Sequence, residues 1–280
     1  AILRAAQSRR ASESRDDARV AAFDLPRNEP ILYTSVFDAT DPTEENHARH
    51  FGSFLGQANG GAYNVVGAGN DTFAATGDLL ARLEARFDGA LAQGIKNHYL
   101  YFSVHGSENR VGFDLPDGGR ITLEPRELMA LFRQPKYNQC RFTLRMNCCN
   151  SGGFRSGEMA AMFRAPGEEG RISVFIQSKP ELPNPIRSTE PRDVDASAPR
   201  GRNWDTPYDY YLVHFLSLNM TYGQAHLAAD RATKTNFPGV DAGVFRSGVL
   251  DGSETADPRT PLRPDRMPRR LDGVGSYDIV

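Results

Sequence analysis

Residues 141–154 read RFTLRMNCCNSGGF, and this stretch decides which fold the rest of the chain is expected to adopt. Its first half alternates apolar with polar side chains, and Phe142, Leu144 and Met146 fall on one face, which is typical of a β-strand. The pattern stops at two adjacent cysteines, and Asn-Ser-Gly-Gly follows as a turn. Ligands bind just beyond the carboxyl ends of parallel strands, so we expect a reactive thiol at the edge of a cleft.

Segments on both sides of this strand alternate between strand-like and helix-like patterns. Strands are predicted at residues 31–37, 62–66, 99–104, 172–177 and 245–250, and residues 111–123 are predicted to form a hairpin that turns at Asp117-Gly118. Helices are predicted at residues 46–57, 74–92, 124–132, 158–163, 207–220 and 223–235. This alternation favours an α/β fold in which a mostly parallel sheet carries helices on both faces.

The composition excludes several classes of partner. The 280 residues carry a formal net charge of -2, which gives no basic surface for nucleic acid, so we expect no nucleic-acid partner. No apolar run approaches the roughly 20 residues of a membrane span, so we expect no membrane partner. Three cysteines are too few for a disulfide framework, which favours a reducing, cytoplasmic setting, with a secreted effector as the alternative.

A second strand pattern ends in a residue that could assist a thiol. Residues 99–104 are almost continuously apolar, as expected for a parallel strand covered on both faces, and His105 and Gly106 follow. A cysteine nucleophile needs a base or cationic partner that raises its thiolate fraction, and a histidine commonly supplies it. Because Gly106 has no side chain, its N–H could approach a substrate carbonyl closely. The sequence therefore predicts a cysteine and a histidine at two strand ends.

These two blocks resemble those of the caspase-like cysteine peptidases, which include the metacaspases and the legumains. YFSVHGS at residues 101–107 is similar to the histidine block of both groups. NCCNSG at residues 147–152 is similar to the DCCHSG of metacaspases and the EACESG of legumains. The resemblance implies a caspase-like three-layer α/β/α sandwich and a cysteine endopeptidase that acts on a protein or peptide without a metal or cofactor.

The same resemblance implies roles for individual residues. Cys149 is the nucleophile, and Cys148 fills the variable position before it. His105 is the general base and acid, and the backbone N–H groups of Gly106 and Cys149 form the oxyanion hole. The remaining cysteine, Cys140, is expected to lie in the core.

Three further residues are expected to bind the substrate. Asn147 stands where the relatives carry an acid, and a neutral amide offers no charge attraction for arginine or lysine. Asp38, after the first strand, could restore an acidic pocket or could simply cap the strand end. Ser178 begins a segment implied to form another pocket wall. The arginine-containing residues 178–205 are implied to be a site of self-processing.

We expect a single peptidase domain at residues 29–250. Residues 1–28 are expected to be an N-terminal extension and a candidate prosegment, and residues 251–280 a tail packed on the surface. Two other functions remain open from the residues: a non-catalytic caspase-like scaffold that binds a partner, and a Cys-His acyltransferase or deamidase. The sequence predicts no oligomeric state.

Overall fold

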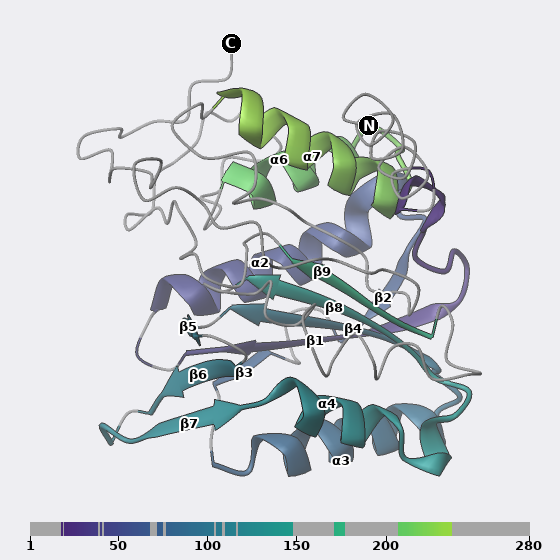
Figure 1. The fold of residues 1–280 in the computed structure, drawn as a ribbon. Helices are drawn as coiled ribbons and strands as arrows, with labels where there is room; N and C mark the ends of the chain where they lie inside the picture. Colours follow the sequence, from purple (N-terminus) through teal and green to yellow (C-terminus); the bar gives the residue numbers. More distant parts are fainter. Residues whose placement is uncertain are drawn as a thin grey trace, which may run out of the picture.

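The computed structural model describes residues 18, 20–38, 40, 42–67, 72–74, 77–103, 105–107, 110–115, 117–147, 171–176 and 207–236. These residues form three layers, in which a parallel β-sheet lies between two layers of helices (Figure 1). The expected α/β class with a three-layer α/β/α arrangement is therefore confirmed.

The central sheet has the strand order β2-β1-β4-β8-β9, and all its pairs are parallel. Its strands are β1 (Pro30–Phe37), β2 (Asn64–Val66), β3 (Thr72–Ala74), β4 (Asn97–Ser103), β8 (Arg141–Asn147) and β9 (Ile172–Ile176). The short strands β2 and β3 both pair with β1, at Pro30–Leu32 and Ser35–Phe37 respectively, while β4 pairs with β1 from Ile31 to Phe37. They are thus two halves of one interrupted strand beside β1.

Helices cover both faces of this sheet (Figure 1). On one face lie α2 (Pro42–Gln57), α6 (Pro207–Leu216) and α7 (Tyr222–Asn236), and on the other lie α3 (Leu79–Ala92) and α4 (Pro125–Phe132). Two 3-10 turns, Ala58–Gly60 and Pro135–Tyr137, follow α2 and α4. Alternate residues of β8 divide between the two cores, since Phe142, Leu144 and Met146 pack on the α3 and α4 side. The central strands β1 and β4 are consequently buried on both faces.

The aromatic residues of the sheet explain why α2 lies so close to β1. The Tyr33 hydroxyl donates to the Ala48 carbonyl oxygen at 2.6 Å. A Cβ added to Gly52 would lie 2.5 Å from the Tyr33 ring, so only glycine allows this approach. The Tyr33 ring also stacks on Tyr99 at a centroid distance of 5.8 Å, which joins α2 and two strands in one core.

A small antiparallel sheet is formed by β5 (His105–Ser107), β6 (Arg110–Asp114) and β7 (Arg120–Leu123). The predicted hairpin is confirmed in β6 and β7, and Gly118 adopts the φ of 81° that its turn requires. In Figure 1 this sheet lies beyond the arrowheads of the central strands.

Most predicted elements are present with shifted ends. α2 begins at Pro42 rather than at residue 46, and α3 begins at Leu79 rather than at residue 74 because Thr72–Ala74 forms β3. α6 ends at Leu216, before the predicted residue 220. The predicted helix at 158–163 and strand at 245–250 lie outside the described residues. Cys140 is fully buried, as expected for a core cysteine. The proposed domain boundaries stay predictions.

His98 of β4 is a histidine buried among aromatic side chains. Its side chain is 2% exposed and lies between Phe87 and Phe142, with ring centroids at 4.8 and 4.9 Å. Neither ring nitrogen has a hydrogen-bond partner among the described residues. Burial lowers the pKa of His98 from 6.5 to about 4, because the apolar surroundings disfavour the charged ring.

We predict that the free energy of unfolding falls as the pH drops from about 6.5 to about 4, because the unfolded chain binds the His98 proton first. The loss contributed by this one side chain is about 3 kcal/mol at its limit. Urea unfolding measured between pH 7.5 and 4 should show that the free energy of unfolding changes less with pH in His98→Leu than in the wild type. Equal dependence in both proteins would show that His98 does not cause it.

Candidate active site at the carboxyl ends of the strands

Three central strands end at the same level of the sheet. Phe37 of β1 is the Cα partner of Ser103 of β4, and Ser103 is in turn the partner of Asn147 of β8. The chain continues past β1 with a backbone hydrogen bond from the Asp38 N–H to the Ser103 carbonyl oxygen at 3.3 Å. The residues that follow these strands therefore start from one edge.

This edge is where a parallel sheet of this order binds its ligands. In the sheet, β1 lies between β2 and β4. After β1 the chain first adds β2 on one side of it and then crosses over to add β4 on the other side. In open parallel sheets, ligands commonly bind beyond the carboxyl ends of the two strands at which the chain changes direction in this way, here β1 and β4.

The predicted site residues differ in how far the structure describes them. Asn147 is the last residue of β8, and His105 and Gly106 are the first two residues of β5. His105 therefore does not end β4, which stops at Ser103; it begins the small antiparallel sheet. Cys148, Cys149 and Ser178 lie outside the described residues.

Asp38 is fully buried at the end of β1. Its Oδ1 atom accepts hydrogen bonds from the Thr40 backbone N–H at 2.9 Å and from the Thr40 hydroxyl at 2.6 Å. This pattern is typical of an aspartate that caps a turn two residues ahead. A role for Asp38 in a substrate pocket stays a prediction. In that role the same carboxylate would have to bind substrate while it holds the turn at Thr40.

An arginine that the sequence did not single out, Arg120 of β7, lies against Gly112 of β6, the strand that pairs with β5. Gly112 of β6 is the Cα partner of His105, and a Cβ added there would lie 2.7 Å from Nη2 of Arg120. The missing side chain of Gly112 thus leaves room for the Arg120 guanidinium, which brings a cation to the strand adjacent to His105.

Beneath the strand ends, Arg145 of β8 and Asp209 of α6 form a buried ion pair. Arg145 Nη2 lies 2.5 Å from Asp209 Oδ1, and both side chains are fully buried. Arg145 Nη1 also donates to the Met146 carbonyl oxygen at 2.9 Å. The Tyr101 hydroxyl donates to the second carboxylate oxygen, Oδ2, at 3.3 Å.

Asp209 thereby connects two paired strands. Tyr101 and Arg145 are Cα partners in the β4–β8 register, so the carboxylate contacts both members of one pair. A second polar contact between the layers joins the hydroxyls of Tyr99 and Tyr222, and burial raises the pKa of both phenols. Only the apolar alternation of β8 was visible in the sequence, where Arg145 occupies a polar position without an identifiable partner.

Neither a metal site nor a membrane span is found among the described residues. Among the residues that the structure describes, no group of three or more His, Cys, Asp or Glu side chains could hold a metal ion. Within the same ranges, no helix is both long enough and apolar enough to cross a membrane. The expectation that no cofactor is needed stays a prediction.

Comparisons with known proteins give no family assignment. The sequence matches no protein-family model, and no curated protein sequence matches it. The solved structures that are similar to the fold include Raptor and a caspase. Raptor from Chaetomium thermophilum has a TM-score of 0.41 and 10% identity, and the match covers 73% of this chain but 20% of Raptor. Caspase-1 from Spodoptera frugiperda has a TM-score of 0.37 and 13% identity, with 70% of this chain and 77% of the caspase covered.

We predict that removing one partner of the buried Arg145–Asp209 ion pair destabilises the fold strongly, whereas replacing both partners with apolar side chains does not. Arg145→Met or Asp209→Leu alone should lower the free energy of unfolding by about 3–5 kcal/mol, because each leaves one buried charge unpaired. The double variant should lie within about 1–2 kcal/mol of the wild type. Urea unfolding of the four proteins measures the coupling, and additive single effects would contradict the pairing.

Proposed function

We propose that this chain is a cysteine endopeptidase in which Cys149 attacks the peptide carbonyl and His105 transfers the protons. The observation that carries the proposal is the register of β4 and β8. Ser103 and Asn147 are Cα partners, and His105 and Cys149 each follow their partner by two residues.

Chain geometry then limits how far apart the two residues can be. Neighbouring strands lie about 4.8 Å apart. Two residues span at most about 7 Å from the last paired position. This short connection supports the proposal that both catalytic residues act at the same edge of the sheet, on the side where parallel sheets bind ligands.

Besides the substrate and a water molecule, the proposed reaction uses only these residues and their backbone. His105 removes the thiol proton of Cys149, and the sulfur adds to the carbonyl carbon to give an oxyanion. The N–H groups of Gly106 and Cys149 would donate to that oxyanion. His105 then gives its proton to the leaving amine, and water hydrolyses the acyl-enzyme to regenerate the thiol.

Specificity is proposed to depend on the charges around the strand ends. Asn147 contributes no charge at the end of β8, and the buried Asp38 carboxylate follows β1. If that carboxylate lies behind the pocket, it favours arginine or lysine before the cleaved bond. The Arg120 guanidinium next to Gly112 of β6 would favour the opposite choice, an acidic residue.

We predict that Cys149→Ala lowers peptide hydrolysis by at least about 10³-fold, because the nucleophile is lost. The matched control is Cys148→Ala, which should retain activity. A thiol-directed peptidyl inhibitor should give one adduct, assigned by mass spectrometry to Cys149. An adduct on Cys148, or full activity in Cys149→Ala, would refute the proposed nucleophile. A protein that binds the peptide without turnover would instead support the non-catalytic scaffold.

Asp38 is tested by a peptide library in which the residue before the cleaved bond varies. We predict that Asp38→Asn lowers kcat/KM for arginine and lysine peptides by about tenfold and changes neutral peptides little, because the charge attraction is removed. Thr40→Ala serves as the control, since it removes the hydroxyl donor to Asp38 and keeps the charge. Equal losses for all peptides in both variants would show that Asp38 only holds the turn.

A further inference from the structure

Residues 20–27 lie across the N-terminal end of α7, far from it in the sequence. Val20 and Leu25 are 7% and 2% exposed and belong to the core formed with α2, α6 and α7. Phe23 packs on the same core, with its ring 5.1 Å from that of Phe175 and 6.0 Å from that of Tyr222. This segment, residues 20–27, is called the strap below.

The strap supplies hydrogen-bond partners that the start of α7 lacks. The first four N–H groups of a helix have no partner within the helix. Here the Tyr222 N–H donates to Asp24 Oδ1 at 3.0 Å, and the Gly223 N–H donates to the Phe23 carbonyl oxygen at 2.9 Å. The third N–H group, that of Gln224, donates to the Thr221 hydroxyl oxygen at 3.2 Å. Strap and cap together therefore satisfy the first three donors.

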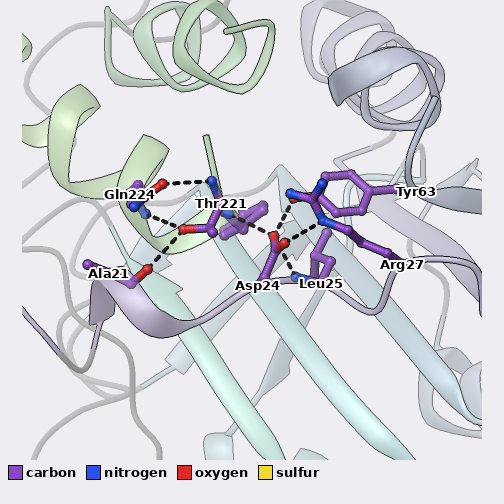
Figure 2. Close-up of polar contacts among 8 residues, drawn as sticks. Ala21, Asp24, Leu25, Arg27, Tyr63, Thr221 and Gln224 are labelled. Carbon is purple, nitrogen blue, oxygen red and sulfur yellow. Dashed lines mark hydrogen bonds and ion pairs between the residues drawn. The ribbon is translucent and has the colours of Figure 1, made fainter. Parts of the chain in front are cut away.

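Thr221 contacts both the helix and the strap (Figure 2). Its N–H donates to Gln224 Oε1 at 3.1 Å, which completes a capping box with the bond from Gln224. The Thr221 hydroxyl also donates to the Ala21 carbonyl oxygen at 2.9 Å. The helix cap is thus continuous with the strap backbone.

Asp24 is the centre of these contacts, as Figure 2 shows. Its Oδ1 atom accepts from the Leu25 N–H at 3.0 Å and from the Tyr63 hydroxyl, in addition to Tyr222. Its Oδ2 atom accepts from Arg27 Nε at 2.9 Å. A carboxylate is favourable at a helix N-terminus because of the exposed donors and the helix dipole. Tyr63 immediately precedes β2, so Asp24 links α7 to the edge of the sheet.

Gly223 shows how closely the strap approaches. A Cβ added to Gly223 would lie 1.6 Å from the Val20 carbonyl oxygen and 2.7 Å from the carbonyl carbon. Both atoms are backbone, so no side-chain rotation relieves the overlap. The strap and a side chain at position 223 are therefore incompatible.

From these contacts we infer that the N-terminal end of α7 is a binding site for a peptide with an aromatic–Asp–aliphatic sequence, and that the chain's own strap, with Phe23-Asp24-Leu25 at its centre, is the occupant that holds α7 on the sheet. The strap is a permanent part of the domain. A cut that removes an N-terminal prosegment and leaves α7 in place must therefore fall before Val20. This inference is independent of the proposed peptidase reaction.

Hydrogen exchange in the full-length chain tests the inference. Gly223→Ala and Asp24→Asn should each speed amide exchange in α7 by about tenfold or more, because the helix opens locally, while α3 keeps wild-type exchange. The matched controls are Gly89→Ala, at a helical glycine whose added Cβ meets nothing within 4 Å, and Asp117→Asn at an exposed turn. Neither control should change α7. Unchanged α7 exchange in both test variants, or equal acceleration of α3, would overturn the inference.

A second measurement tests the site as a peptide-binding site. A protease recognition sequence inserted at the exposed residues 28–29 allows the strap to be cut after folding. After the cut, the N-terminal fragment should stay bound and co-elute with the rest of the chain in gel filtration. In the Gly223→Ala variant, the cut fragment should dissociate. Dissociation from the cut wild-type protein with α7 still protected from exchange would contradict the inference.

Discussion

The parallel register between β4 and β8 is the constraint on which the structure depends. Seven consecutive Cα pairs run from Asn97↔Arg141 to Ser103↔Asn147. Because side chains alternate between faces, a shift by one residue would exchange the two cores: the apolar residues of β8 would face α6, and Arg145 would face α3 and α4. The correct register places Arg145 opposite Asp209 and brings both strands to one edge. The same pairing thus determines the packing of the sheet and the level at which the proposed catalytic residues begin.

The helical layer of α6 and α7 is joined to the sheet by polar contacts inside an apolar core. Asp209 contacts β4 and β8 together, Tyr222 contacts Tyr99, and Asp24 holds the start of α7. Such contacts contribute little net stability compared with apolar packing of the same volume. Their geometry is directional, however, and a buried charge is tolerated only with its partner, so they restrict where this layer can sit on the sheet. The carboxyl ends of β4 and β8 are therefore packed against a helical layer, α6 and α7, whose position on the sheet is defined by these contacts.

Local sequence patterns predicted the elements better than their ends or their long-range contacts. The β8 strand and the turn at Gly118 followed from alternation and turn residues, which are local properties. The sequence could not show that β4 stops at Ser103 and that His105 starts a new strand, because strand pairing decides where a strand ends. Asp209 and Arg145 are 64 residues apart in the sequence, and the contact between the strap and the Thr221 cap of α7 joins residues 200 apart. Contacts of this kind depend on the assembled fold, although the Thr221 and Gln224 pair of a capping box was readable in the sequence. The nucleophile itself rests on the resemblance of the NCCNSG and HG blocks.

The pH dependence of alkylation at Cys149 tests the proposed pair most directly. The rate of reaction with iodoacetamide, followed by mass spectrometry in a Cys148→Ala background, reports the thiolate fraction at each pH. A histidine partner should lower the pKa of the Cys149 thiol below the roughly 8.5 of a free cysteine, and His105→Ala should return it to about that value. An ordinary thiol pKa that is the same with and without His105 would contradict the Cys149–His105 pair.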